Sequence, residues 1–350
     1  MAWAYSRQDR IYLQTETTWG TIPNSTGAAT VAGTNYCRLS KVSLDPVTDL
    51  YPVTYKTGVR GMAPGIKGRQ YGKWSYSGPL IPSGNGTTAP DLGPILTALF
   101  GAAPTIAGGA IPYVLSDTIK SFTMYRWRGP LSGNTLNNQV GFGCVVSTAT
   151  FSIGQNFADF TASGESLWVL DTEQYTAGVT DGDAKKGGFT TAGQAAYPSE
   201  PGTQTANGTP VYGFVGSFKE GGSQTVMANI QNVSINVATG NQLIRDTFGT
   251  FTPSGVMGDT RKVGISLGYY DSDDQAMKDV RAASLSKAGV DLIVAVGNTQ
   301  YNTITFTMKG IQFETPTTDD SGPRFKQSVA ESTAHPSALT TTDEFAMTIS

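Results

Sequence analysis

The chain has 350 residues with a formal net charge of −3; only 15% of its residues are charged, whereas 42 are glycine. Few charges and many glycine, threonine, serine and asparagine residues are typical of strands, turns and interfaces, so the composition favours a mainly β protein. Lysine and arginine form no run, which argues against tight nucleic-acid binding through many phosphate contacts. The length predicts two domains of roughly 150 residues each.

The first half of the sequence predicts one short helix among several strands. Apolar residues spaced by three and four positions indicate a helix over 92–100, with Asp91 as its N-cap and Gly101 at its end. The buried face of this helix is expected to hold Leu92, Ile95, Leu96 and Leu99. Alternating apolar residues predict strands at 39–43, 73–77, 111–116, 122–127 and 144–152.

The second half predicts a second helix in the same setting. This helix covers 275–287, is capped by Asp273 or Asp274, and stops near Gly289. Its inward face is expected to hold Ala276, Met277, Val280 and Ala283. Strands are predicted at 226–237, 262–270, 292–296, 303–308 and the C-terminus. The phase of alternation changes within 226–237, which requires a bulge or turn near 231–232.

The predicted elements follow one order in both halves, and such self-similarity suggests one packed unit used twice. We therefore expect a first domain at 1–175, a linker or surface insertion at 176–210, and a second domain at 211–350. The linker belongs to a longer stretch, 171–210, that is rich in Gly, Pro and Thr, lacks periodicity, and is expected to lie in neither core. Each half also has a long loop between its first two strands, at 45–67 and 240–258. In a scaffold these loops would contact a neighbouring subunit, although surface loops lengthen easily without a function.

Residues that could carry catalysis or bind a metal are scarce. Cys37 and Cys144 are far apart and are expected to be reduced and buried, with a disulfide as the alternative. His335 is the single histidine and precedes a proline in a turn, and no nucleophile motif accompanies it. The Asp271-Ser-Asp-Asp segment lacks the glycine and the distal glutamate of a calcium loop. We therefore predict no enzyme activity and no catalytic, cofactor-binding or metal-binding residues.

A second hypothesis is that the chain is a β-sandwich module that binds carbohydrate or a receptor. It depends on Trp19, Trp74, Trp127 and Trp168, which could form stacking platforms for a ligand. Aromatic residues at alternating strand positions are, however, usually part of a core. The state of assembly distinguishes the hypotheses, because a binding module would be a monomer or trimer and a scaffold would form rings or filaments.

Four segments of the chain resemble the tail tube (major tail) proteins of long-tailed bacteriophages. They are Ile11-Tyr-Leu-Gln-Thr-Glu-Thr-Thr-Trp-Gly-Thr-Ile-Pro, the strand entry Gly68-Arg69, the helix segment Pro90-Asp-Leu…Ile-Leu-Thr-Ala-Leu-Phe-Gly-Ala, and Asp343-Glu-Phe-Ala-Met-Thr-Ile. The likeness covers most of the chain in order of elements. Many members have one tube domain per chain, and the two domains expected here resemble the duplicated type.

This resemblance implies a fold, an assembly and a set of partners. The fold would be two tandem β-barrel or sandwich domains, each with one short helix packed on its sheet. Three chains would form a ring with pseudo-sixfold symmetry, or six a hexameric ring, and stacked rings would form the tail tube of the virion after assembly in the host cytoplasm. The implied partners are other copies of the chain, the tape-measure protein and DNA in the lumen, and the tail terminator and distal tail proteins. No membrane partner and no cofactor are implied.

Overall fold

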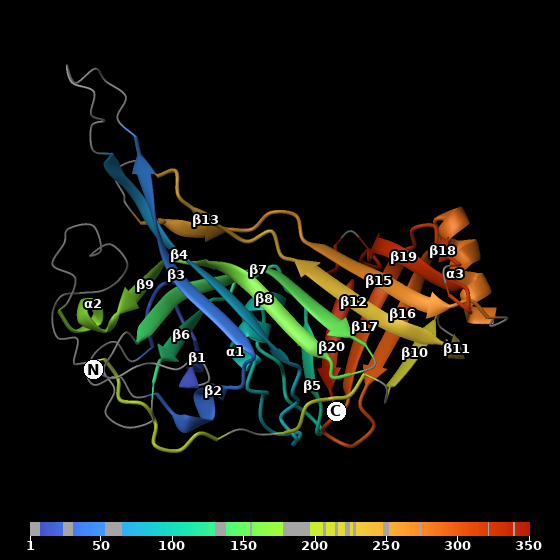
Figure 1. Ribbon diagram of the computed structural model, residues 1–350, viewed down its shortest axis with the longest axis horizontal. Coiled ribbons are helices and arrows are strands. Elements are labelled where there is room, and N and C mark those ends of the chain that lie inside the picture. Colours follow the sequence, from blue (N-terminus) through green and yellow to red (C-terminus); the bar gives the residue numbers. More distant parts are fainter. Residues whose placement is uncertain are drawn as a thin grey trace.

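The computed structural model describes residues 8–23, 31–52, 65–129, 138–154, 156–177, 197–205, 208–213, 216–220, 225–226, 229–247, 252–272, 275–320, 322–338 and 340–350. Within these residues the protein is mainly β, with one large antiparallel sheet and a separate two-stranded ladder. Figure 1 shows the N-terminal strands, in blue to green, toward one end of the long axis and the C-terminal strands, in orange to red, toward the other.

We define the N-terminal half as residues 8–177 and the C-terminal half as residues 216–350. The N-terminal half contains β1 (Arg10–Thr15), β2 (Tyr36–Cys37), β3 (Lys41–Tyr51), β4 (Ile66–Pro79), α1 (Gly93–Phe100), β5 (Ile111–Val114), β6 (Phe122–Trp127), β7 (Gln139–Ile153), β8 (Asp159–Ser166), β9 (Trp168–Asp171) and α2 (Thr172–Ala177). The C-terminal half contains β10 (Gly216–Glu220), β11 (Thr225–Val226), β12 (Ile230–Ala238), β13 (Gln242–Ile244), β14 (Gly255–Met257), β15 (Lys262–Tyr270), α3 (Gln275–Ser286), β16 (Gly289–Val296), β17 (Ile304–Gln312), β18 (Thr317–Asp319), β19 (Lys326–Thr333) and β20 (Phe345–Ile349).

The pattern of strand pairing repeats between the halves. Strand β1 pairs with β2 and β6, as β10 pairs with β11 and β16. Strand β4 pairs with β3 and β8, as β15 pairs with β12 and β19. Strand β7 pairs with β6, β8 and β9, as β17 pairs with β16, β19 and β20. Every ladder within the N-terminal half thus has a counterpart in the C-terminal half, among the described residues.

A β-bulge occurs at the same position of this pattern in each half. The β6–β7 ladder shifts register after Phe122, and the β16–β17 ladder shifts after Val290. At each shift the strand that has the extra residue, β7 or β17, contains a glycine in the left-handed region. These are Gly143 with φ 62° and Gly310 with φ 57°. We call these two residues the bulge glycines. Left-handed backbone favours glycine, so the same local geometry is encoded twice.

Two ladders join the halves, and we call them together the seam. Residues 148–153 of β7 lie opposite residues 233–238 of β12, and residues 111–114 of β5 lie opposite residues 346–349 of β20. One hydrophobic core continues across the seam. The ring of Phe151 lies 4.9 Å from Phe160 in its own half and 5.0 Å from Phe306 in the other. The halves are therefore packed together rather than connected by a free linker.

Helix α1 confirms the predicted helix at 92–100, with a different N-terminus. Leu92 is the N-cap residue and Pro94 lies in the first turn, where a missing N–H costs nothing. The Asp91 carboxylate is 3.0 Å from Nε of Arg38. Gly101 ends the helix with φ 76°, as expected, and its N–H donates to the carbonyl of Thr97.

Helix α3 confirms the predicted second helix and most of its inward face. Met277, Val280 and Ala283 are buried. The proposed caps Asp273 and Asp274, and the side chain of Ala276, lie outside the described residues. A register shift between Ile230 and Asn232 confirms the bulge expected near 231–232. Cys37 and Cys144 are free and buried, as predicted.

The predicted loop at 45–67 is wrong for its described residues, which continue β3 and β4. Asp45 pairs with Lys73, and the ladder extends to Tyr51 opposite Ile66. Pro46 and the nearby glycines are typical of a loop, but an edge strand accepts proline, and Pro46 lies within β3. The loop at 240–258 likewise contains a short hairpin, formed by β13 and β14. The described residues of both segments therefore form more regular structure than expected.

The stretch at 171–210 was expected to belong to neither core, and its described ends contradict this. Tyr175 of α2 is buried in an aromatic cluster on the outer face of β1 and β6, and Tyr197 packs against the same cluster. The side chain of Glu200 forms an ion pair with Arg10 of β1. The residues on both sides of 178–196 are thus attached to the N-terminal half. Residues 178–196 themselves lie outside the described residues.

Candidate functional site

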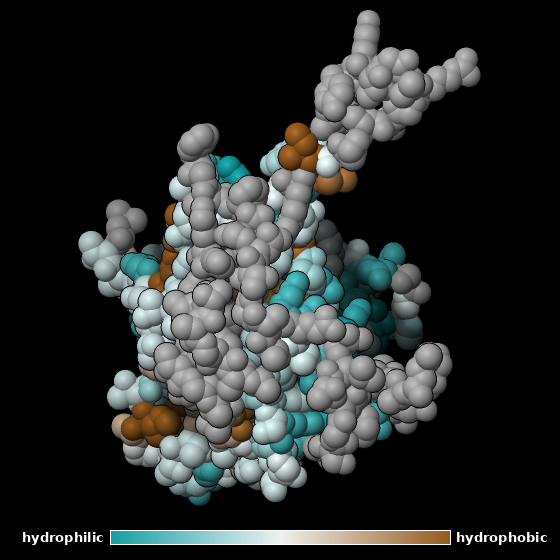
Figure 2. Space-filling view, turned by 90° about the vertical axis from the view of Figure 1, so that its left-hand side faces the viewer, coloured by the Kyte–Doolittle hydropathy of each residue, from teal (hydrophilic) through white to brown (hydrophobic). Residues whose placement is uncertain are grey.

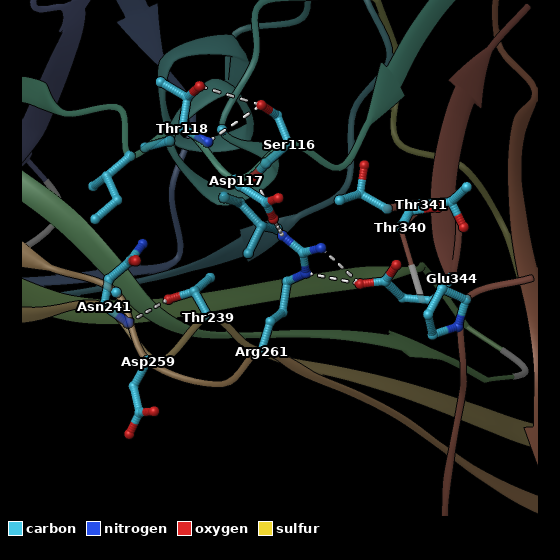
Figure 3. A pocket seen from close by; sticks show the side chains of 17 residues that line it. Ser116, Asp117, Thr118, Thr239, Asn241, Asp259, Arg261, Thr340, Thr341 and Glu344 are labelled. Carbon is cyan, nitrogen blue, oxygen red and sulfur yellow. Dashed lines mark hydrogen bonds and ion pairs between the residues drawn. The ribbon is translucent and has the colours of Figure 1, made fainter. Parts of the chain in front are cut away.

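A cavity of about 600 Å³ lies at the seam and is lined by both halves. Its walls are the C-terminal end of α1, the 116–119 segment after β5, the segments that flank β13 and β14, and the residues before β20. Figure 3 shows that Arg261 extends from the C-terminal half between Asp117 on one side and Glu344 on the other. The cavity is therefore centred on an ionic contact between the halves.

The guanidinium of Arg261 is held by acceptors from both halves. Its Nε donates to Oε1 of Glu344 at 2.9 Å, and Nη2 lies 2.7 Å from the same oxygen. Its Nη1 donates to the carbonyl oxygen of Ser116 at 3.2 Å and lies 3.6 Å from the Asp117 carboxylate. The Arg261 and Glu344 side chains are 16% and 10% exposed. Because arginine is always charged, loss of Arg261 would leave a largely buried carboxylate without its counterion.

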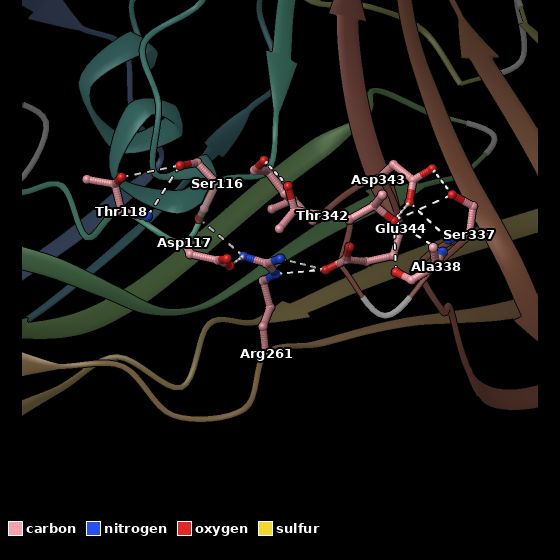
Figure 4. Close-up of polar contacts among 11 residues, drawn as sticks. Ser116, Asp117, Thr118, Arg261, Ser337, Ala338, Thr342, Asp343 and Glu344 are labelled. Carbon is pink, nitrogen blue, oxygen red and sulfur yellow. Dashed lines mark hydrogen bonds and ion pairs between the residues drawn. The ribbon is translucent and has the colours of Figure 1, made fainter.

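The residues before β20 are fixed by a second carboxylate, Asp343 (Figure 4). Lys309 Nζ donates to Asp343 at 2.8 Å, and the Ser337 N–H, the Ser337 hydroxyl and the Thr341 hydroxyl also donate to it. These donors, with Lys309 the largest contributor, hold the pKa of Asp343 well below its usual value. Thr342 donates to the carbonyl of Leu115 at 2.9 Å, which attaches this turn to the N-terminal half.

A second candidate surface is the outer part of the β3–β4 hairpin, formed by 45–51 and 66–72, which we call the arm. Leu50, Tyr51 and Ile66 on the arm are 68%, 54% and 64% exposed. Figure 2 shows hydrophobic atoms where the described part of the arm projects from the body, next to a largely white and teal surface. A group of large apolar side chains at a projecting hairpin is typical of a contact surface.

The hairpin of β13 and β14, which we call the strap, crosses from the C-terminal half onto the N-terminal half. Leu243 is buried against Tyr71 and Val145. The N–H of Leu243 donates to Glu165 at 3.2 Å, and Arg245 forms an ion pair with the same carboxylate at 3.2 Å. The Arg245 guanidinium also lies 4.4 Å from the centre of the Tyr71 ring. The strap therefore fastens one half to the other outside the seam ladders.

Glu16, in the segment that resembles the tail tube family, is a buried carboxylate with four donors. Its Oε1 accepts from Thr123 and from the N–H of Gly143, both at 2.7 Å. Its Oε2 accepts from Ser121 at 2.7 Å and from the N–H of Gly20 at 2.9 Å. Burial, the largest cause, raises the pKa of Glu16 despite these donors. This residue joins the turn after β1 to the bulge of β7.

The other titratable candidates are not brought together into a site. His335 is exposed, as expected, and Asp271 accepts a hydrogen bond from Gln327 at 3.0 Å. Among the described residues no group of three or more His, Cys, Asp or Glu side chains could hold a metal ion. In the same part of the chain no helix is long and apolar enough to cross a membrane.

The aromatic residues proposed as stacking platforms are mostly core residues. Trp74, Trp127 and Trp168 are 2%, 4% and 8% exposed. Trp74 donates to the carbonyl of Val145 at 3.0 Å, and Trp19 is half-buried against two core clusters. The interpretation of Trp74, Trp127 and Trp168 as an exposed binding surface is therefore wrong, because alternation placed them on the packed faces of strands.

Sequence reasoning missed the residues that join the halves. Arg261 is paired with Glu344, 83 positions away in its own half, and donates across the boundary to Ser116. Arg245 is paired with Glu165 across the same boundary. Neither pair has a local motif, since each is created by the packing of distant segments. The local sequence does not single out Arg261, because Asp259 and Lys262 beside it are charged as well.

Comparison of the chain with protein-family models gives no match. Comparison with curated proteins gives no match either.

Proposed function

We propose that this chain is a structural protein of the tail tube type found in long-tailed bacteriophages, built from two copies of one β-sandwich unit. The observation that carries the proposal is the repeated ladder pattern with its repeated bulge glycines, in which the two units are already joined edge to edge. A chain that joins two copies of a unit in this way has the geometry to continue the series with further chains. The four segments that resemble the family add to this argument.

The physics of open sheet edges supports the same function. An exposed edge normally has to be blocked against aggregation, whereas a tube subunit satisfies its edges by pairing with its neighbours. Rings close when successive contacts are related by rotation, and contacts between rings produce a filament. We propose trimeric rings with pseudo-sixfold symmetry, with a hexamer as the alternative, stacked into a tube in the virion tail.

The partners follow from this role. The lumen of the tube would hold the tape-measure protein during assembly and pass DNA at ejection, and the tube ends would contact the tail terminator and distal tail proteins. A net charge of −3 suits a conduit along which DNA must move without tight binding. The segments at 45–67 and 240–258 were both expected to contact a neighbouring subunit. The strap instead packs on its own chain, so the arm is the segment proposed to contact other copies.

Electron microscopy of the purified protein tests this proposal. Negative-stain images are expected to show rings or stacked tubes, and light scattering a mass that is a multiple of the 36.9 kDa chain. Tubes should dissociate and re-form with protein concentration. A protein that stays monomeric across concentrations, or a monomer or trimer that binds glycans on an array, would contradict the tube and favour the binding module.

A further inference from the structure

The seam has a counterpart that one chain leaves unfilled. In the seam, residues 148–153 of β7, which we call its outer part, pair with residues 233–238 of β12. Strands β12 and β3 are equivalent, because each precedes and pairs with the strand that leads into a helix of its half. Among the described residues β3 pairs only with β4. Among the described residues, the β3 edge that corresponds to the β7-facing edge of β12 is therefore open.

The equivalent of the outer part of β7 is β18. Strand β7 pairs with β8 over residues 145–152. In the C-terminal half this ladder is divided, since β17 meets β19 only at Gln312 and β18 continues along residues 326–328 of β19. Within the described part of the chain β18 pairs with β19 alone. In that part of the chain, the β18 edge that corresponds to the β12-facing edge of β7 is open as well.

We propose that β18 of one copy pairs with β3 of a second copy, so that the contact between chains repeats the ladder between the halves. This inference rests on the proposed self-assembly and defines its lateral contact. Figure 1 shows the arm that continues β3 and the strand β18 toward opposite ends of the long axis, so the two edges of one chain do not meet. The contact is head-to-tail and can be repeated from chain to chain.

The bulge glycines set the register of this contact. Two residues beyond them, Val145 lies opposite Glu165 and Gln312 lies opposite Thr333. Thr333 therefore corresponds to Glu165. In the next ladder Glu165 lies opposite Lys73 of β4, and Thr333 lies opposite a glycine of β15, Gly264.

The alignment continues from that pair along β4 and β15. Three residues further on are Tyr76 and Leu267, both buried, and their partners in β3 and β12 are Val42 and Val233. Val42 therefore corresponds to Val233. Three residues further along each of these strands, Asp45 corresponds to Asn236.

The correspondence of Tyr76 with Leu267 also aligns β18 with β7. Tyr76 lies opposite Ala162 of β8, and Leu267 lies opposite Val329 of β19. The residue before Ala162 pairs with Thr150 of β7, and the residue before Val329 pairs with Thr317 of β18. Thr317 therefore corresponds to Thr150.

In the seam Thr150 lies opposite Asn236, so between chains Thr317 should lie opposite Asp45. The expected antiparallel register is Thr317 with Asp45, Thr318 with Leu44, and Asp319 with Ser43.

The side chains at these positions suit the contact. In the seam the Thr150 hydroxyl donates to Oδ1 of Asn236 at 3.4 Å, and a Thr317 hydroxyl can donate in the same way to the Asp45 carboxylate. Pro46 follows Asp45 and has no N–H, so the ladder should end there, and the three residues of β18 match this length. Lys41 shares a strand face with Ser43 and would lie diagonally across from Asp319, at a distance where opposite charges attract.

The arm is placed by the same correspondence. The arm begins in the outer part of β3, and the strap comes directly after the equivalent strand β12. The strap packs on Tyr71, Val145 and Glu165. The equivalents of these residues are Lys262, Gln312 and Thr333 in the C-terminal half. We therefore expect the arm of one copy to cover this surface of the next copy, which removes its exposed apolar side chains from water.

Disulfide trapping between two single-cysteine variants tests the register. An Asp45→Cys protein is mixed with a Thr317→Cys protein before assembly and oxidised mildly, and non-reducing gels measure the covalent dimer. Directly opposite residues have Cβ atoms about 4.5–5.5 Å apart, close to disulfide geometry. The matched control replaces Asp45→Cys by Asp49→Cys, which moves the thiol roughly 13 Å along the strand. The native cysteines are buried and should not react.

The expected result is a covalent dimer that is at least tenfold more abundant for the Asp45→Cys and Thr317→Cys mixture than for the control or for either variant alone. Rings or tubes without this selective dimer would overturn the β3–β18 contact and leave the tube proposal standing. A protein that remains monomeric by light scattering and microscopy would overturn both. A Thr318→Pro variant, folded by circular dichroism, should also lose assembly, and normal tubes from it would contradict the ladder.

Discussion

Single buried polar residues connect parts of this molecule that are far apart in sequence. Glu16 lies 105 and 107 positions from two of its donors, Ser121 and Thr123, and a third donor is the N–H of a bulge glycine. Each carboxylate oxygen accepts two hydrogen bonds, so only a side chain that can accept all four fits this site. A buried donor without an acceptor costs free energy, which makes this position intolerant of even isosteric change.

The Glu16→Gln substitution should therefore lower the free energy of unfolding. Either orientation of the amide points its NH₂ at a backbone N–H, of Gly143 or of Gly20, and neither N–H can rotate away. The expected cost is about 1–3 kcal/mol, measured by urea unfolding. Glu314→Gln is the control, because its exposed ion pair with Lys287 should contribute less than about 1 kcal/mol. Equal effects of the two substitutions would contradict the role of the Glu16 network.

Asp343 should make the folded protein less stable as the pH falls into the acid range. The pKa of its carboxyl is lowered in the folded protein, chiefly by Lys309, so the folded state binds a proton less readily than the unfolded state. The contribution is therefore present above the ordinary carboxyl pKa and is lost as pH falls below it. Melting temperatures of the wild type should fall between pH 4 and pH 2 more steeply than those of Asp343→Asn. If the melting temperatures of the wild type and of Asp343→Asn fell in parallel with pH, Asp343 would not be coupled to folding. An Asp320→Asn substitution at an exposed position is the matched control.

The arm and the strap follow equivalent strands and differ in what covers them. The strap buries Leu243 at 5% exposure against the N-terminal half of its own chain, whereas the arm leaves Leu50 68% exposed. Burial of apolar area stabilises the contact of the strap with the N-terminal half. The exposed apolar side chains of the arm predict a contact with another molecule. The chain thus covers one copy of this element internally and leaves the other exposed, which fits the proposed assembly.

The same substitution in these two hairpins should have different effects. Leu243→Ala removes a buried contact and should lower the free energy of unfolding by about 2 kcal/mol. Leu50→Ala should change it by less than about 0.5 kcal/mol and should instead weaken assembly. Chemical denaturation of dilute protein and tube yield by sedimentation measure the two effects. Loss of monomer stability in Leu50→Ala would mean that the arm is already covered within its own chain.

At the scale of the whole molecule, the seam predicts that the two halves unfold as one unit. They share two ladders, a continuous core that includes Phe151 and Phe306, and the hydrogen bond from Arg261 to the carbonyl of Ser116. Cooperative unfolding is expected when the interface between two units is as well packed as their interiors. The distribution of tryptophan makes this testable, since all five tryptophans of the sequence lie within the first 168 residues.

A Phe306→Ala substitution in the C-terminal half should lower the stability of both halves. Phe306 is fully buried, so its loss should cost about 3–5 kcal/mol. Tryptophan fluorescence reports the N-terminal half and circular dichroism reports the whole chain. Both denaturation midpoints should shift together. A fluorescence midpoint that stays at the wild-type value, with a biphasic dichroism curve, would indicate two independent domains.

The sequence by itself determined the elements whose pattern is local. Spacing of Leu92, Ile95, Leu96 and Leu99 was sufficient for α1, because one face of a short helix has to be apolar wherever it packs. Alternation was sufficient for 262–270, and the change of phase at 231–232 located a bulge. The common order of elements in both halves was also visible, since turns and apolar periods are encoded within each segment.

Only the tertiary structure decided which distant segments meet. The extension of β3 through Pro46 depended on the edge position of that strand, which no local pattern contains. The Arg261–Glu344 pair, the Glu16 network and the packing of the strap all join residues many positions apart. Hydrogen bonds and apolar contacts of this kind form only after the chain has folded, so composition and periodicity carry no record of the partner.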